Sequence, residues 1–213
     1  MTQTNRTTTW IVWGALGLTI LAILAAFLRH QTDAKLVRPL LFPVPVSLAD
    51  FTLTNQLGQP VSLREMRGSV WVADIIFTRC MGPCPRLTEQ MRELQKLFAP
   101  GEGIRLLTLT TDPEFDTPEI LKRYSGRFQA DPNRWWFLTG SKQEIADVAI
   151  DGLKLTAMEK EPAKREDAAD LFIHSLLMVV VDKQGRLRAA FESTGEGWKE
   201  KVAATARYLA RER

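Results

Sequence analysis

Three short apolar runs, each followed by a segment with helical signals, constrain the fold of this chain more than any other feature. The runs are VWVADIIF (70–77), IRLLTLT (104–110) and WWFLTG (135–140). Runs of this length that are almost continuously apolar are typical of strands buried on both faces of a sheet. The helices predicted after them cover residues 87–98, 116–128 and 141–150. Asp116 or Thr117 is the expected N-cap of the second helix, with Pro118 in its first turn, and Ser141 is the expected N-cap of the third.

Elements at the two ends of this pattern complete the predicted domain. One hairpin is expected from FTLTNQ and PVSL around a turn at Leu57-Gly58, and a second hairpin from strands 175–182 and 186–193. An amphipathic helix, 198–212, follows. Strand–helix alternation followed by a hairpin and a helix predicts a thioredoxin-like α/β domain, with a central mixed sheet flanked by helices. The densely charged residues 158–170 are expected to form a solvated loop.

The N-terminal part of the chain carries a long uncharged segment. Trp10 to Leu28 contains no charged side chain, and at about 1.5 Å per residue it approaches the roughly 30 Å hydrocarbon core of a bilayer. A cleaved signal peptide is the alternative, but its apolar core usually has roughly 7–15 residues, and no A-x-A-like site follows here. We therefore expect four regions: a tail (1–9), a transmembrane anchor (10–28), a proline-containing linker (29–46) and a thioredoxin-like domain (47–213).

The charge of the chain argues against nucleic acid as a partner. The formal net charge is +3, and no basic stripe or interleaving of aromatic and basic residues occurs. Arg6 before the anchor, and Arg29, Lys35 and Arg38 after it, mildly favour a cytoplasmic domain. That rule weakens for large domains. The cysteine site favours the opposite orientation, with the domain on the periplasmic side of a bacterial cytoplasmic membrane.

The only two cysteines lie four residues apart in the segment TRCMGPCP (78–85). Cys80 is expected to leave the C-terminal end of a buried strand, and Cys84 to lie at or near the N-terminus of the next helix. Open α/β sheets place ligands beyond this end of their strands, and a helix N-terminus favours thiolate over thiol. Two buried structural thiols are the alternative, which the intervening Gly82 and Pro83 disfavour. Dithiol redox enzymes usually carry C-x-x-C, whereas the looser C-x-x-x-C loop suits two sulfurs around one metal.

His174 is a candidate third ligand. It lies about ninety residues after the cysteines, just before an apolar strand, in DLFIHSLLMVVVD. A lone histidine there is usually a core or loop residue. In a thioredoxin-like sheet, however, this loop faces the cysteine loop, and dithiol oxidoreductases of that fold place a cis-proline in it. The chain has Ile173-His174-Ser175 instead, which favours a metal site over general redox chemistry.

Three motifs in order resemble the SCO/SenC family of copper-binding proteins that assist cytochrome c oxidase assembly. They are T-x-C-x-x-x-C-P (Thr78 to Pro85), T-D-P-E-x-D-T-P-E (Thr111 to Glu119), and His174 before SLLMVVVD with a D-x-x-G turn (Asp182 to Gly185). The resemblance covers roughly residues 47–210, and the expected anchor also fits the family.

Carried over residue by residue, the resemblance implies that Cys80, Cys84 and His174 ligate copper, as Cu(I) or Cu(II), and that Asp112 supports the site from nearby. The chain departs from the family in two places. The spacer between the cysteines is Met-Gly-Pro where many members have Pro-Asp-Val, and a highly charged loop precedes His174. These departures bear on metal affinity and target, whereas the ligand set is retained.

We therefore expect a membrane-anchored metallochaperone, not an enzyme, that delivers copper to cytochrome c oxidase or matures its copper site. Its expected partners are the membrane, through residues 10–28, the oxidase subunit that holds the copper site, and a reductant that keeps the thiols from forming a disulfide. The alternative is a membrane-anchored thiol–disulfide oxidoreductase that acts on cysteines of an oxidase subunit or another exported protein. A peroxiredoxin-like peroxidase is the weakest hypothesis, because no surrounding residues indicate a peroxidatic cysteine.

Overall fold

The computed structural model describes residues 10, 12–24, 41–159, 172–174 and 176–212 of the chain. The chain divides into two compact units, Met1–Arg38 and Pro39–Arg213. In the first unit, residues 12–24 form a helix whose side chains are exposed. None of the helices in the described ranges has both the length and the apolar character needed to span a bilayer. The predicted anchor (10–28) and linker (29–46) also include residues that lie outside these ranges.

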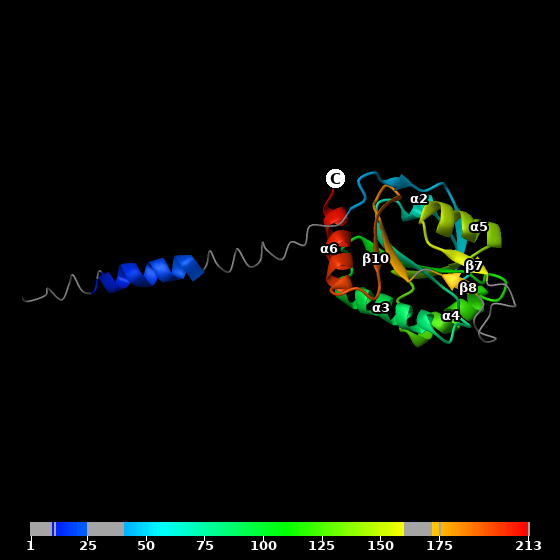
Figure 1. The fold of residues 1–213 in the computed structure, drawn as a ribbon, viewed down its shortest axis with the longest axis horizontal. Helices are drawn as coiled ribbons and strands as arrows, with labels where there is room; N and C mark the ends of the chain where they lie inside the picture. Colours follow the sequence, from blue (N-terminus) through cyan, green and yellow to red (C-terminus); the bar gives the residue numbers. More distant parts are fainter. Residues whose placement is uncertain (1–9, 11, 25–40, 160–171, 175, 213) are drawn as a thin grey trace, which may run out of the picture. The chain divides into compact units, whose positions relative to one another are not determined.

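The second unit is built on an eight-stranded mixed sheet with the strand order β1-β10-β9-β4-β5-β6-β2-β3 (Figure 1). The central strands β4, β5 and β6 are parallel, and the strands outside them pair antiparallel. This arrangement confirms the predicted mixed α/β fold. The strands are β1 (Val46–Ser47), β2 (Thr52–Asn55), β3 (Pro60–Ser62), β4 (Val70–Ile76), β5 (Ile104–Thr110), β6 (Trp135–Thr139), β9 (Leu177–Val181) and β10 (Arg186–Glu192).

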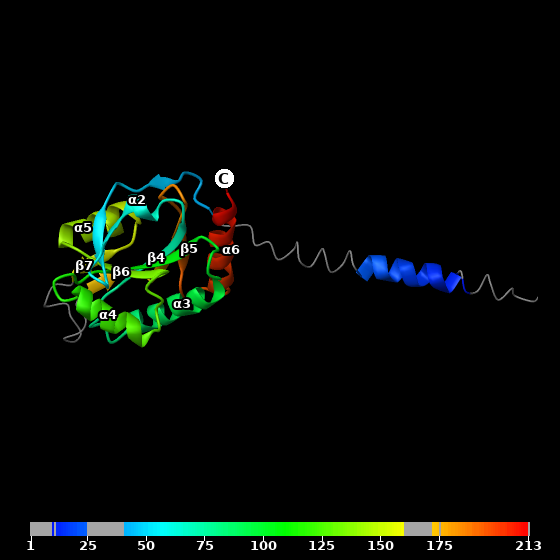
Figure 2. The ribbon, with the colours of Figure 1, turned by 180° about the vertical axis from the view of Figure 1, so that it is seen from behind.

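Helices cover both faces of the sheet, because its central strands are apolar on both sides. Figures 1 and 2 show α3 and α4 on one side and α2 and α5 on the other. Side chains of α3, α4 and α6 pack in one hydrophobic cluster, which also contains Cys80 and Cys84. Side chains of α2, α5 and η1 pack in a second cluster. The helices are α2 (Leu63–Met66), α3 (Pro83–Leu97), α4 (Pro118–Arg127), α5 (Lys142–Ala146), the π-helix η1 (Asp147–Gly152) and α6 (Trp198–Arg211).

The helix ends follow the sequence signals, with one shift. Ser141 caps α5 as predicted, and Thr117 caps α4 by accepting a hydrogen bond from the Ile120 amide (3.4 Å). Helix α3 begins at Pro83, earlier than the predicted residue 87, because a proline fits the first turn of a helix without a donor to lose. Cys84 therefore lies in the first turn of α3, as expected.

Short strands near residue 174 were not predicted. β7 (Ala157–Glu159) and β8 (Phe172–His174) form a separate two-stranded sheet in which Ala157 lies opposite His174. The start of the predicted charged loop (158–170) is therefore a strand, and residues 160–171 lie outside the described ranges. At the other end of the domain sequence, Val46 already pairs with Leu187, so the sheet begins within the segment predicted as linker.

Candidate metal centre

The cysteine loop leaves the sheet beside the loop that carries Asp112. Strands β4 and β5 pair in register from Val70 opposite Ile104 to Ile76 opposite Thr110, so the two strands end at the same level. The Thr111 amide continues the ladder by donating to the Ile76 carbonyl (2.8 Å). The loops that follow these strands therefore start side by side at the carboxyl edge, where open α/β sheets bind ligands.

Cys80 and Cys84 are both thiols, and both are buried. Cys80 is 8% exposed and Cys84 is fully buried in the first turn of α3. The loop turns back at Cys80, whose amide donates to the Phe77 carbonyl (3.2 Å). The two side chains are hydrogen-bonded to each other. Sulfur atoms in such contact are close enough to bind one metal ion, since a metal–thiolate bond is about 2.3 Å long.

The protonation of Cys84 differs from the sequence-based expectation. The hydrogen bond with Cys80 and burial both raise the pKa of the Cys84 thiol, and the nearby Asp74 carboxylate acts in the same direction. A hydrogen bond with the backbone of Phe77 lowers the pKa of Cys84, but the net shift is upward. The prediction that Cys84 is a thiolate is therefore wrong for this state, because the hydrogen bond with Cys80 and burial raise its pKa. A metal that binds here must displace protons.

Asp116 holds the cysteine loop to the end of β5. Its carboxylate accepts hydrogen bonds from the amide of Thr78 (3.1 Å), from the hydroxyl of Thr78 and from the hydroxyl of Thr110. The side chain is fully buried. Burial raises the pKa of Asp116, and these hydrogen bonds act in the opposite direction. The sequence offered Asp116 only as a helix cap, so its role in fixing the loop was missed.

Asp112, predicted to support the site, contacts the cysteine loop through Arg79. Its carboxylate oxygen Oδ2 lies 2.5 Å from Nη2 and 3.0 Å from Nε of Arg79, the residue before Cys80. Asp112 is 5% exposed, and its amide donates to the hydroxyl of Thr110 (3.0 Å). The carboxylate of Asp112 thus contacts the loop that carries the thiols.

A buried polar network lies behind Cys84. The hydroxyl of Thr88 donates to the Cys84 carbonyl (2.9 Å) and shares a hydrogen bond with the Tyr124 hydroxyl (2.9 Å). Burial raises the pKa of Tyr124, and the Cys84 sulfur contributes in the same direction, so the phenol is a neutral hydrogen-bonding partner at physiological pH. These hydrogen bonds anchor the first turn of α3 against α4.

His174 is described only by its backbone, as the last residue of β8. Its side chain lies outside the described part of the structure. Among the side chains that are described, no group of three or more His, Cys, Asp or Glu residues could hold a metal ion. The structure therefore brings together the two predicted sulfur ligands, and the third predicted ligand remains a prediction.

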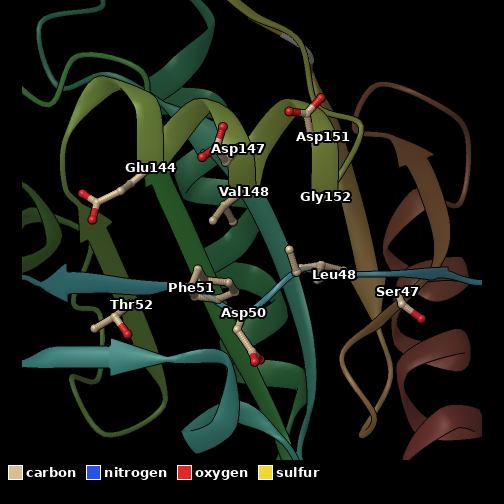
Figure 3. Close-up of a pocket in the computed structure, with 11 residues that line it drawn as sticks. Ser47, Leu48, Asp50, Phe51, Thr52, Glu144, Asp147, Val148, Asp151 and Gly152 are labelled. Carbon is tan, nitrogen blue, oxygen red and sulfur yellow. The ribbon is translucent and has the colours of Figure 1, made fainter.

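A separate cavity of about 490 Å³ lies on the other face of the sheet (Figure 3). Carboxylates from α5 and η1 line it together with Asp50 and Phe51 from the segment before β2. Leu48 and Val148 in its wall belong to the second hydrophobic cluster, whereas both cysteines belong to the first. This cavity is therefore not part of the cysteine site.

The mixed sheet with two thiols at its carboxyl edge defines a thioredoxin-like dithiol protein. A family model described as SCO1/SenC matches residues 45–210. The chain belongs to the SCO1/SenC family.

Its similarity to known members is substantial over this region. The chain is 36% identical over 147 residues to the SCO1 protein homolog of Bacillus subtilis (strain 168), which covers 68% of this chain and 73% of that protein. The structure of BsSco, a member of the Sco family of cytochrome c oxidase assembly proteins with a disulfide switch, is 30% identical. Its TM-score is 0.68, and the match covers 81% of this chain and 98% of that chain. ScoI of Bradyrhizobium japonicum with copper bound is 27% identical with a TM-score of 0.63, covering 76% and 99% respectively.

Proposed function

We propose that this chain binds copper through Cys80, Cys84 and His174 and delivers it to cytochrome c oxidase, or matures the copper site of that enzyme. The observation that carries the proposal is the contact between the thiols of Cys80 and Cys84 at the carboxyl edge of the sheet. Membership of the SCO1/SenC family, and the copper held by ScoI of Bradyrhizobium japonicum, support copper as the metal.

The chemistry of the three side chains suits this metal. Two thiolates favour soft Cu(I), and an imidazole extends the site to Cu(II). The strand pairing supports a place for His174 in the ligand set. β9 runs antiparallel to β4, with Ala73 opposite Val179, so the N-terminal end of β9 lies at the carboxyl end of β4. His174 precedes Leu177, the first residue of β9, by three positions, and Cys80 follows β4.

The location proposed for the domain is the outer side of a bacterial cytoplasmic membrane, on an anchor formed by residues 10–28. The uncharged run supports the anchor, as do the exposed apolar side chains of the helix over residues 12–24. In an oxidising compartment the adjacent thiols would form a disulfide and lose the metal, so the proposal includes a thiol reductant as partner.

Copper binding by the full chain tests the proposal. After anaerobic reconstitution with Cu(I), we expect one copper per chain in the native protein, and loss of copper in Cys80→Ser and in Cys84→Ser. Cu(II) binding should weaken at least about tenfold in His174→Ala. The other histidine provides the matched control, and His30→Ala should bind as the native chain does. Unchanged Cu(II) affinity in His174→Ala would remove that residue from the ligand set.

A second candidate function is thiol–disulfide exchange, which the hydrogen-bonded thiols also favour. Cys80 and Cys84 would form a disulfide and pass two electrons and two protons to a substrate disulfide, which becomes two thiols. The relative BsSco has a disulfide switch, which supports this candidate. Exchange with a disulfide-bonded peptide that survives His174→Ala, is lost in Cys80→Ser and proceeds without copper would favour this function over metal delivery.

A further inference from the structure

A groove of about 510 Å³ begins at the cysteine loop and runs along α4. We call it the arginine groove, because three of the side chains that line it are Arg79, Arg123 and Arg127. The remaining lining residues are Thr78, Phe115, Ile120 and Tyr124. Thr78 and Arg79 directly precede Cys80, so one end of the groove lies on the loop that holds the thiols.

The charge of the arginine groove is positive. Arg79 pairs with the buried Asp112, but its own side chain is 42% exposed. No ion pair joins Arg123 or Arg127 to a carboxylate within the described ranges. Glu119 lies one turn before Arg123, and its pKa is lowered first by hydrogen bonds at the start of α4 and last by the charge of Arg123.

Aromatic rings hold two of these arginines in place. The guanidinium of Arg79 lies 4.3 Å from the ring centroid of Phe115, and that of Arg127 lies 4.8 Å from the ring centroid of Tyr124. Stacked guanidinium groups are fixed in direction, so less side-chain entropy is lost when they bind a carboxylate. Phe115 is itself 39% exposed, which leaves apolar surface among the charges.

We propose that the arginine groove binds an acidic segment, with apolar side chains among its carboxylates, of the protein that exchanges copper or electrons with the cysteines. The inference rests on the proposed function for the identity of that partner. Because Cys80 is 8% exposed and Cys84 is fully buried, a partner must approach closely along the loop to reach the sulfurs. A positive groove that starts on this loop orients a partner of opposite charge and raises its rate of encounter.

Peptide binding to the full chain tests the groove. The probe is a fluorescein-labelled peptide of alternating Glu and Leu, compared by fluorescence anisotropy with one of alternating Lys and Leu. At about 50 mM salt, where surface charges are weakly screened, we expect the Glu peptide to bind at least about tenfold more tightly. Replacing the two groove arginines on α4, Arg123→Gln with Arg127→Gln, should weaken Glu-peptide binding about tenfold, and raising the salt to about 500 mM should remove most of the difference.

A control with the same change in net charge separates the groove from general electrostatics. Arg64→Gln with Lys154→Gln changes exposed residues that flank the second hydrophobic cluster, away from the cysteines. This variant should bind the Glu peptide as the native chain does. Three results would overturn the proposal. These are equal weakening in both variants, no binding of the Glu peptide to the native chain, and displacement of that peptide by inorganic phosphate added at the same concentration of negative charge. Both variants should bind as much copper per chain as the native protein does. If the native protein itself binds no copper, the proposed function is rejected, but the peptide result still stands.

Discussion

The carboxylate of Asp116 accepts hydrogen bonds from both the amide and the hydroxyl of Thr78, 38 residues earlier in the chain. The same carboxylate accepts a hydrogen bond from Thr110 at the end of β5. Through this one buried side chain, the loop that carries Cys80 is fixed to the neighbouring strand. The position of the first thiol therefore depends on a carboxylate that acts through Thr78, two residues before Cys80.

Asp116→Ala should destabilise the domain by about 3 kcal/mol, because it leaves the buried hydroxyl of Thr110 and the part-buried amide and hydroxyl of Thr78 without their acceptor. The free energy of unfolding in urea measures the effect. Glu119→Ala, at an exposed position on the same segment, should have a much smaller effect and serves as the control. A loss as small as that of the control would show that Asp116 does not hold the loop.

The pair of Arg79 and Asp112 should show a coupling energy of about 1–2 kcal/mol in a double-mutant cycle with alanine, because Asp112 is buried. The exposed pair of Glu114 and Lys142, whose side chains are 74% and 55% exposed, is the comparison, and its coupling should be below about 0.5 kcal/mol. Urea unfolding of the single and double variants gives both values. Equal coupling in the two pairs would mean that burial of Asp112 adds nothing to the contact.

Alkylation should label Cys80 before Cys84 in the folded chain, by a factor of about ten or more at neutral pH. Cys84 is fully buried and its pKa is raised by the hydrogen bond with Cys80 and by burial, so little reactive thiolate is accessible there. Iodoacetamide labelling followed by fragment mass spectrometry distinguishes the two positions. In urea the two rates should converge, and preferential labelling of Cys84 in the folded chain would contradict the described protonation.

Asp182 should contribute stability that depends on pH. It is buried in the turn between β9 and β10; burial acts to raise its pKa, but hydrogen bonds from Arg186 and Arg188 outweigh burial and hold the pKa below its ordinary value. A lowered pKa in the folded state gives stability that is present above the unfolded-state pKa and is lost as the pH falls through the folded-state value. Asp182→Asn should therefore cost about 2 kcal/mol at pH 7, with the difference shrinking below about pH 4.

Unfolding of the native chain and of Asp182→Asn between pH 3 and pH 7 tests this dependence. Asp50→Asn is the control, because Asp50 is exposed and its ion pair with Arg67 is long, at 3.6 Å. Its effect should be small at every pH. A constant difference between Asp182→Asn and the native chain over this range would contradict the linkage.

The elements that sequence predicts well here are those with a strong local signal. The buried run at 104–110 became β5 with the predicted bounds, and Ser141 and Thr117 cap the helices that they were expected to cap. Each signal depends on residues within one or two turns of the chain. Local chemistry was therefore enough to predict the central sheet, its helices and the position of Cys84.

The parts that sequence did not predict depend on distant residues or on very short pairings. β1 is two residues long and is defined by its contact with β10, far along the chain. Asp116 accepts a hydrogen bond from the distant Thr78, whereas the residues next to Asp116 in the sequence indicate only a helix start, which Thr117 caps. The raised pKa of Cys84 likewise comes from its surroundings in space, which the order of residues around a helix N-terminus does not reveal.

The in-register pairing of β4 and β5 has a consequence for how this domain can vary. One residue inserted into either strand shifts the following loop by about 3.3 Å along the sheet, which exceeds the length of a hydrogen bond. Thr78 would then lose Asp116, and Arg79 would lose Asp112. We therefore expect changes of length to be tolerated beyond these four anchoring positions and outside the spacer between the cysteines, for example after α4, because the two loops are held together as one structural unit.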